Sequence, residues 1–228
     1  MSKLAGKIVV ITGGGSGVGK AVALLCLKEG AKVVIAGRDA AKLTAVVAEA
    51  NAGDRLRAVT TDVTNARQCQ ALIDAATQAF GRVDILVNNA GTNLKARTIR
   101  ELTPESWDAM IRTNLDGAFY CTKAVLPQMF ERKDGVIVNV VSVAGKRANP
   151  LGGAAYVAAK FAMGGLGLVL SNEEKDSGVR VSNVYPGEID TPILKAEDVA
   201  EAVLFVAALP PRVSVPELVI KPTAQMYW

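Results

Sequence analysis

Short apolar runs alternate with longer helical patterns along the whole chain, and this alternation constrains the fold more than any other feature. The runs that predict strands are Ile8–Thr12, Val33–Ala36, Leu56–Val59, Val83–Val87, Val136–Val141, Val179–Tyr185 and Glu217–Ile220. The patterns between them predict helices over Gly17–Gly30, Ala40–Ala50, Ala66–Phe80, a long region that starts at Thr103–Pro104, Ala154–Lys175 and Glu197–Ala208. Strands separated by helices form right-handed βαβ units in one sheet. We therefore expect an α/β fold with a doubly wound, seven-stranded parallel sheet in the order 3-2-1-4-5-6-7.

The composition agrees with this fold and limits the chemistry. A chain of 228 residues suits one domain over residues 1–228. Half of the residues are hydrophobic and only 5% are aromatic, so Val, Leu, Ile and Ala must build the core, as in a parallel sheet covered on both faces. The chain has no histidine, which excludes a Ser-His-Asp triad, a Cys-His pair and a His-ligated metal. We expect no metal site, and in an enzyme another residue must move the proton.

Charge and cysteine content bear on partners and location. Lys and Arg number 26 against 22 Asp and Glu, and these basic residues form no long run, so we expect no nucleic-acid partner. The start of the chain lacks the layout of a signal peptide, and no apolar run reaches the ~18 residues that suggest a membrane span. Cys26, Cys69 and Cys121 are isolated and are expected to be reduced thiols. These features predict a cytoplasmic protein with no membrane partner.

A glycine-rich turn follows the first predicted strand. Gly13, Ser16, Gly17, Val18 and Gly19 lie where a helix N-terminus presents free N–H groups to a pyrophosphate, which predicts dinucleotide binding. The glycines do not follow the common GxGxxG register. The stretch Gly14–Lys20 also fits a P-loop, but Ala21 stands where a P-loop needs Ser or Thr for magnesium. A tight turn with a structural role alone is the third reading.

The end of the second strand indicates which dinucleotide binds. An acidic residue there would bond the ribose hydroxyls of NAD, but this chain has Gly37 followed by Arg38. A guanidinium suits the 2′-phosphate of NADP, which we favour, with NAD as the alternative. Asp39 could instead cap the next helix, and Arg38 could be an ordinary surface charge.

Ser142, Tyr156 and Lys160 are candidate catalytic residues. Ser142 follows the fifth strand, and the i, i+4 spacing puts Tyr156 and Lys160 on one helix face. A free tyrosine is a poor base at neutral pH, but an adjacent ammonium would lower its pKa and allow acid–base catalysis. A tyrosine packed on a helix beside a snorkelling lysine is the alternative.

Taken together, the motifs closely resemble the short-chain dehydrogenase/reductase family over nearly the whole length. The matching stretches are Thr12–Gly19, Asp62-Val63, Asn88–Gly91, Asn114, Ser142, Tyr156-Val-Ala-Ala-Lys160 and Pro186-Gly187 with Thr191. The resemblance implies an NAD(P)-dependent oxidoreductase that interconverts a secondary alcohol and a carbonyl, with Tyr156 as the acid/base, Ser142 bonding the substrate oxygen and Lys160 bonding the nicotinamide ribose.

The resemblance also implies roles for other residues. Asp62 and Val63 would flank the adenine. Asn88, Asn89, Ala90 and Gly91 would stabilise the end of the sheet and line the cofactor site, although Asn88, Asn89 and Gly91 could serve only the turn. Asn114 would hold a water linked to Lys160, or bend its helix. Pro186 and Gly187 form a turn, and Ile189 and Thr191 would hold the carboxamide.

The chain departs from the family in its substrate lid. Only Pro192–Ala196 separate Thr191 from Glu197, so the lid near residues 190–197 is unusually short, and either the pocket is open or a lid segment is missing from this chain. The resemblance implies a homodimer or homotetramer built on the helix from Ala154 and its predecessor, with the aromatic tail against a neighbouring subunit. Alternatives to the small-molecule oxidoreductase are a dinucleotide-binding regulator without catalysis and, more remotely, a P-loop NTPase.

Overall fold

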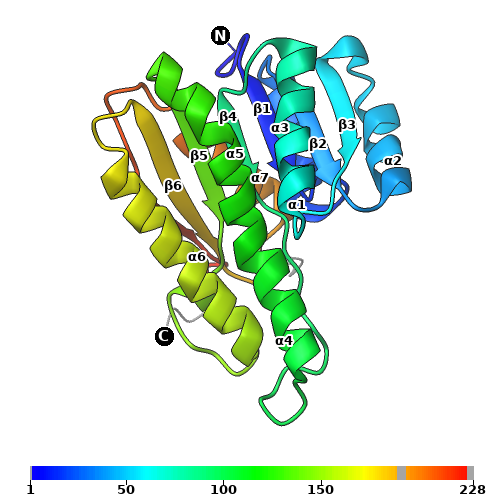
Figure 1. Ribbon diagram of the computed structural model, residues 1–228, viewed down its shortest axis with the longest axis vertical. Helices are drawn as coiled ribbons and strands as arrows, with labels where there is room; N and C mark the ends of the chain where they lie inside the picture. The colour runs from blue at the N-terminus through cyan, green and yellow to red at the C-terminus, as the bar shows by residue number, and fades with distance from the viewer. Residues whose placement is uncertain (1, 189–193, 225–228) are drawn as a thin grey trace.

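The computed structural model describes residues 2–188 and 194–224, which contain seven parallel strands in the order β3-β2-β1-β4-β5-β6-β7 (Figure 1). The predicted fold class and strand order are confirmed. The strands are β1 (Ile8–Thr12), β2 (Lys32–Gly37), β3 (Leu56–Thr60), β4 (Ile85–Asn88), β5 (Gly135–Val140), β6 (Val179–Pro186) and β7 (Glu217–Ile220).

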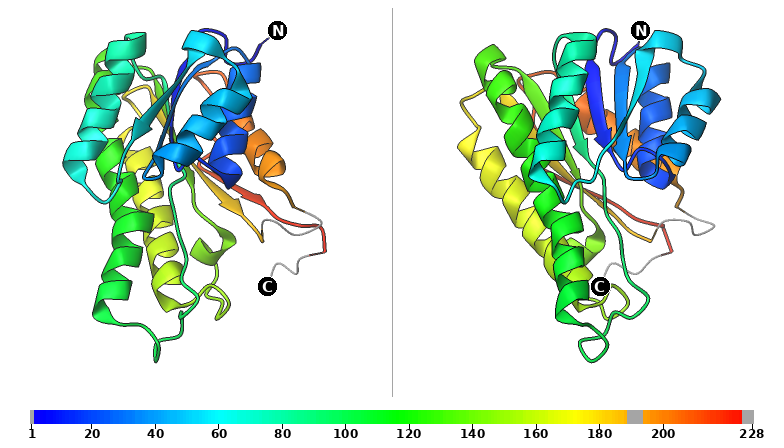
Figure 2. Two further views of the ribbon diagram at one scale, coloured as in Figure 1. Left: turned by 90° about the vertical axis from the view of Figure 1, so that its right-hand side faces the viewer. Right: turned by 45° about the vertical axis from the view of Figure 1, so that its right-hand side comes forward.

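Helices cover both faces of this sheet, as Figure 2 shows edge-on. The helices are α1 (Gly17–Lys28), α2 (Ala40–Ala50), α3 (Ala66–Phe80), α4 (Pro104–Ile111), α5 (Gly117–Arg132), α6 (Ala154–Glu173) and α7 (Ala196–Ala207), with short turns η1 (Gly53–Arg55), η2 (Arg112–Asp116) and η3 (Val143–Gly145). Helices α1, α2 and α7 share one hydrophobic cluster, and α3 and α5 share the other. The sheet therefore separates two apolar layers.

Strand β1 shows why the sheet is apolar on both sides. Val9 and Ile11 belong to the cluster with α1 and α7, whereas Val10 belongs to the cluster with α3 and α5. Successive side chains of a strand point to opposite faces, so a strand covered twice must be an unbroken apolar run. The run predicted from the sequence is thus explained by burial on both faces.

Local capping residues set where the helices begin and end. Thr103 accepts a hydrogen bond from the Ser106 backbone N–H, and the Ser106 hydroxyl accepts one from the Thr103 backbone N–H, which forms a capping box before Pro104. Asn65 caps α3, which ends at Gly81 in the left-handed region. The predicted starts at Pro104 and Ala66 are therefore confirmed.

Several predicted boundaries shift by one or two residues, as at the ends of α1 and α6, and two of the differences have a visible cause. The long helical region after Thr103 is interrupted by the π-helical turn η2, which separates α4 from α5. Strand β4 begins at Ile85 rather than Val83, because the Val83 backbone N–H donates to the Gln128 side chain and not to a neighbouring strand. In both cases a side chain forms hydrogen bonds with backbone groups, and a hydrophobic pattern in the sequence does not reveal such bonds.

Helix α6 is the one helix in the described residues that is long and apolar enough, by length and composition, to cross a membrane. One side of it packs on the sheet through residues that include Ala159, Met163 and Leu170. Its buried side also carries Lys160, which is 3% exposed. One side of α6 is therefore buried, whereas its opposite side, which includes Phe161 and Val169, is exposed.

Candidate active site

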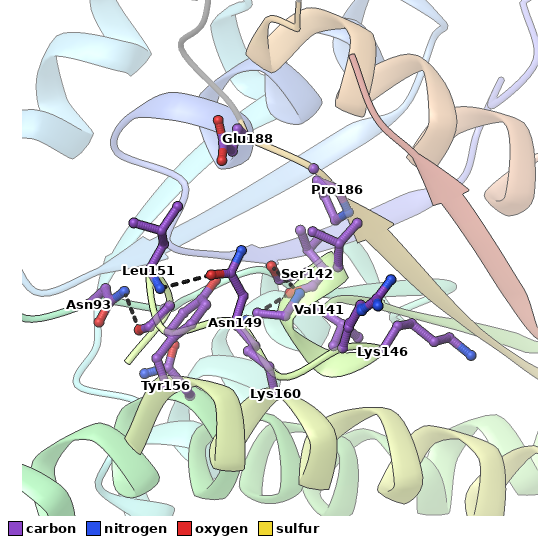
Figure 3. A pocket seen from close by; sticks show the side chains of 18 of the residues that line it. Asn93, Val141, Ser142, Lys146, Asn149, Leu151, Tyr156, Lys160, Pro186 and Glu188 are labelled. Atoms are coloured by element: carbon purple, nitrogen blue, oxygen red, sulfur yellow. Dashed lines mark hydrogen bonds between the residues drawn. The ribbon is translucent and has the colours of Figure 1, made fainter. Parts of the chain in front are cut away.

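A cavity of about 750 Å³ lies beyond the carboxyl ends of the central strands (Figure 3). Predicted site residues from six parts of the chain line it: Val18, Asn89, Gly91, Asn114, Ser142, Tyr156, Lys160, Pro186 and Gly187. In open α/β sheets ligands bind at this edge, where the strand order reverses. The structure thus brings Val18 of the glycine-rich turn and the catalytic candidates to one cavity, whereas Gly13, Ser16, Gly17 and Gly19 are not among its lining residues.

The backbone conformation of the glycine-rich turn leaves the N-terminus of α1 accessible to a ligand. Gly13 has a φ of +68°, which favours glycine, and a Cβ at Gly19 would overlap the Gly13 carbonyl oxygen. Ser16 is the N-cap of α1, but its side chain accepts no capping hydrogen bond, so the first N–H groups of the helix keep their capacity to bind an anion. This cradle fits the pyrophosphate of a dinucleotide.

Asn89 ties this turn to the end of β4. Its amide nitrogen Nδ2 donates to the carbonyl oxygens of Thr12 and Gly13, and its backbone N–H donates to the Thr12 hydroxyl, which also accepts from the Ala90 N–H. Asn89 and Ala90 therefore hold the turn in place, which is one of the roles predicted for this stretch. Asn89 also lines the cavity.

Ser142, Tyr156 and Lys160 meet where β5 ends above α6 (Figure 3). The Ser142 hydroxyl lies close enough to the Tyr156 phenol to lower its pKa, and it accepts a hydrogen bond from the Ala144 N–H at 3.1 Å. The Lys160 ammonium lies 5.7 Å from the centre of the Tyr156 ring and donates to the Val140 carbonyl oxygen at 3.0 Å. Helix α6 starts at Ala154, whose N–H donates to the Arg97 carbonyl, so Tyr156 lies in its first turn.

The pKa values in the chain without cofactor differ from the sequence-based expectation. Burial raises the pKa of the Tyr156 phenol, against a smaller lowering by the Ser142 hydroxyl. Burial also lowers the pKa of Lys160 to about 8. The expectation of a lowered tyrosine pKa is contradicted, because the loss of water around the buried phenol outweighs the lowering by Ser142.

Asn114 lies inside the π-helical turn η2 and is 1% exposed. Its Nδ2 donates to the carbonyl oxygens of Thr92 and Met110, and its Oδ1 accepts from the Thr92 N–H. A Cβ added at Gly91 would lie 2.8 Å from Asn114 Oδ1 and 3.6 Å from Lys160 Nζ, so a side chain there would intrude between them. The helix irregularity at Asn114 is confirmed, and the water link to Lys160 stays a prediction.

The residues predicted for the adenosine half of the cofactor lie outside the cavity lining. Arg38 is exposed after β2, and the Asp39 side chain caps α2 by accepting from the Lys42 N–H. Asp62 accepts from the backbone N–H and hydroxyl of Thr64, and the Val63 side chain packs against Gly117.

Other predicted features fall on residues that the structure does not describe. Ile189 and Thr191, the first two residues of the short lid connection and the last four residues of the tail lie outside the described ranges. Their predicted roles stay predictions.

The cavity also has a basic wall that the sequence motifs did not reveal. Its charged lining residues among those described are Arg97, Lys146, Arg147, Lys160, Lys221 and Glu188. Most of the other lining comes from the segment between β5 and α6, where the side chains of Asn149 and Leu151 face the cavity in Figure 3. Their position after a central strand was the available signal, but no residue pattern distinguishes them from an ordinary loop.

Comparisons with known proteins agree with this geometry. A family model described as short chain dehydrogenase matches residues 7–202. An uncharacterized oxidoreductase from Staphylococcus aureus is 39% identical over 233 residues, which cover 97% of this chain and 100% of that protein. A similar oxidoreductase from Staphylococcus haemolyticus is 34% identical over the same shares.

Three solved structures are similar to nearly the whole chain. A closed form of serine dehydrogenase complexed with NADP+ has a TM-score of 0.90 and 32% identity, covering 96% of both chains. A metagenomic short-chain oxidoreductase in complex with NADP has a TM-score of 0.89 and 34% identity, covering 97% of this chain and 100% of that one. Serine dehydrogenase from Escherichia coli has a TM-score of 0.89 and 35% identity, covering 96% and 100%.

Proposed function

Because the chain belongs to the short chain dehydrogenase family of nicotinamide-dependent oxidoreductases, we propose that it interconverts a secondary alcohol and a carbonyl with NADP(H). Tyr156 is the acid/base of this reaction. The observation that carries the proposal is the cavity itself, in which Ser142, Tyr156 and buried Lys160 share one space with Val18 at the start of α1.

The residues present fit a dinucleotide. The amide cradle of Gly13–Gly19 would hold the pyrophosphate, and Lys160 and Tyr156 would lie against the nicotinamide ribose. When bound, this cofactor supplies the hydride and, in its oxidised form, a positive charge near Tyr156 that would favour the phenolate.

The protein residues would manage the proton. In the direction of carbonyl reduction, the hydroxyls of Ser142 and Tyr156 donate hydrogen bonds to the substrate oxygen, and the Tyr156 phenol then gives up its proton to the new alkoxide. A phenol whose pKa is raised by burial is protonated at neutral pH and ready for this direction. Lys160, close to the ring, stabilises the phenolate that remains.

The preference for NADP over NAD rests on the end of β2. Gly37 occupies the place of an acidic residue, Asp39 is engaged as the cap of α2, and Arg38 is exposed beside the turn. Two of the similar structures contain NADP by description. A guanidinium would bind the 2′-phosphate through charge-assisted hydrogen bonds.

The substrate we propose carries an acidic group, as a hydroxy acid or its keto form does. The described lining of the cavity has five cationic side chains and one acidic side chain, Glu188, and one of the five cations, Lys146, is paired with Glu217. Such an excess of one charge concentrates and orients an oppositely charged substrate. Two of the similar structures are serine dehydrogenases, which also act on a substrate with a carboxylate.

A substrate panel with a Tyr156→Phe control tests the proposal. Purified protein is titrated with NADPH, NADH and ATP by cofactor fluorescence and then assayed with hydroxy acids, keto acids and uncharged ketones. We expect NADPH binding, turnover of a carbonyl, and in Tyr156→Phe loss of turnover with NADPH binding retained. Unchanged turnover in Tyr156→Phe would refute the mechanism, and NADPH binding without turnover of any substrate would favour a non-catalytic regulator.

We also propose that the active form is a homodimer or homotetramer in the cytoplasm. Phe161, Leu168 and Val169 lie on one side of α6 by their spacing and are exposed, as are Phe119 and Phe130 of α5. A second copy of the chain would cover this apolar surface. A monomer by light scattering at micromolar concentration would refute the assembly.

A further inference from the structure

Three asparagines form a buried row across the centre of the sheet. Asn88 of β4, Asn139 of β5 and Asn183 of β6 occupy paired positions on adjacent strands, and each is at most 3% exposed. We call these three residues the amide row. Since side chains in register on parallel strands share a face, the row points to one layer of helices.

The row is a continuous chain of hydrogen bonds. Asn88 Nδ2 donates to Asn139 Oδ1 at 3.0 Å, and Asn139 Nδ2 donates to Asn183 Oδ1 at 2.9 Å. Asn183 Nδ2 then donates to the Gly164 carbonyl oxygen at 2.9 Å. Each amide of the row therefore donates to the next group in the direction of α6, and the hydrogen bonds in such a chain polarise and strengthen one another.

The row continues to the wall of the cavity. Asn183 Nδ2 lies 3.4 Å from the Tyr185 hydroxyl, which donates to Glu217 Oε1 at 2.7 Å. Glu217 pairs with Lys146, whose ammonium lies 4.6 Å from the centre of the Tyr185 ring and lines the cavity. One polar path thus joins the middle of the sheet to the proposed substrate pocket.

Helices α5 and α6 both rest on this path. The Thr122 hydroxyl of α5 accepts from Asn88 Nδ2 at 3.1 Å. A Cβ at Gly164 would lie 2.9 Å from the Tyr185 hydroxyl, and a Cβ at Gly167 would overlap the amides of Asn139 and Asn183. These two glycines therefore let α6 approach the sheet closely.

The contact is close to the catalytic groups. Gly164 lies one helical turn beyond Lys160 and two turns beyond Tyr156. On β5, Asn139 directly precedes Val140, whose carbonyl oxygen accepts from Lys160 Nζ. Two consecutive residues of β5 therefore serve the two groups: Asn139 belongs to the amide row, and Val140 accepts the hydrogen bond of the catalytic lysine.

Apolar side chains would fill this part of the core without the cost of desolvating amides. Amides add direction, because a hydrogen bond from Asn183 to the Gly164 carbonyl fixes the rotation and axial position of α6, whereas apolar packing permits small slides. A displacement of about 1 Å between reacting groups costs on the order of 10²-fold in rate.

We propose that Asn183, at the head of the amide row, is a positioning residue that sets the place of Tyr156 and Lys160 through the Gly164 carbonyl. The Tyr185–Glu217–Lys146 group anchors this contact at the cavity wall. The proposal rests on the proposed function of the same site.

Matched glycine variants of α6 test it. Gly164→Ala brings a methyl group against the Tyr185 hydroxyl, whereas Gly165→Ala makes the same chemical change where a Cβ has nothing within 4 Å. Tyr185→Phe removes the close oxygen, so the double variant Gly164→Ala/Tyr185→Phe should regain the room it needs. Each variant is assayed for kcat, for the NADPH dissociation constant and for the isotope effect with NADPH deuterated at the transferred position. The mass of each variant is measured by light scattering, because Gly165 lies on the outward side of α6, where a second copy of the chain is proposed to bind.

We expect Gly164→Ala to lower kcat by about tenfold or more and to raise the isotope effect, with NADPH affinity within about twofold. Gly165→Ala should match the parent, and the double variant should recover to the level of Tyr185→Phe alone. Asn183→Ala should resemble Gly164→Ala if it folds.

Equal kcat in folded Gly164→Ala and Gly165→Ala, or no rescue by Tyr185→Phe, would overturn the proposal. These outcomes are read against an active parent protein, whereas failure of the proposed function would be seen as an inactive parent. The two failures are therefore distinguishable.

Discussion

Replacement of Lys160 by methionine should stabilise the protein while it abolishes catalysis. Lys160 is 3% exposed, and its pKa is lowered from 10.5 to about 8 by burial alone. This difference corresponds to about 3 kcal/mol by which the folded state disfavours the charged lysine. Methionine has a similar length and no charge.

The gain at neutral pH is smaller than this figure. Lys160→Met leaves the Val140 carbonyl oxygen without the donor that now lies at 3.0 Å, which costs about 1 kcal/mol or more. We expect Lys160→Met to raise the free energy of unfolding by about 1–2 kcal/mol at pH 7.

The dependence on pH identifies the cause. Between about pH 8 and 10.5 the folded parent has released the Lys160 proton while the unfolded chain still holds it, so the unfolded state binds more protons and the free energy of unfolding rises with pH. Lys160→Met lacks this rise. Its advantage over the parent should therefore shrink by about 2 kcal/mol between pH 7 and pH 9.5.

Urea unfolding at both pH values, at one protein concentration and without cofactor, measures this difference. Lys123→Met, which removes an exposed lysine of α5, is the control and should keep the pH dependence of the parent. A parallel pH dependence in Lys160→Met and the parent would refute the argument from burial.

Three further predictions concern the site. Ser142→Ala should lower kcat about 10²-fold with NADPH affinity unchanged, because one donor to the developing oxyanion is lost. Steady-state kinetics measure kcat, and fluorescence titration measures NADPH affinity. A normal kcat would show that Ser142 takes no part in the mechanism. Arg38→Ala should weaken NADPH binding about tenfold or more while NADH binding stays the same, and equal losses for both cofactors would contradict a 2′-phosphate contact. Gly19→Ala should abolish binding of both cofactors, because its Cβ would overlap the Gly13 carbonyl oxygen; intact binding by titration would show that the turn does not hold the pyrophosphate.

Hydrophobic patterning was sufficient for the sheet because its strands are covered on both faces. The buried runs of β1 and β2, and the caps at Thr103 and Asn65, follow from residue type and spacing alone. The π-helical turn at Asn114 could not be predicted with certainty, because it depends on hydrogen bonds to Thr92 that join segments distant along the chain.

The pKa direction of Tyr156 was mispredicted for a related reason. The i, i+4 spacing correctly placed Tyr156 and Lys160 on one helix, but it did not show that both groups lose water, or that the ammonium donates to Val140. Likewise, the basic wall with Lys146 and Arg97 depends on how the segment after β5 folds back over the cavity. The spacing of charged residues in the sequence gives the wrong direction of a pKa shift where burial is the dominant cause of that shift.

Burial of Lys160 also explains why α6 needs a directional contact with the sheet. An ammonium in the core favours any displacement that returns it to water, by up to about 3 kcal/mol. Apolar packing by Met163 and Leu170 resists separation from the sheet but not a small rotation that would expose the lysine. The bond from Asn183 to the Gly164 carbonyl, one turn away, resists that rotation, because it would leave a buried amide and a carbonyl without partners. A catalytic lysine and a buried amide row are therefore two parts of one arrangement, in which the row opposes the displacement that the charge favours.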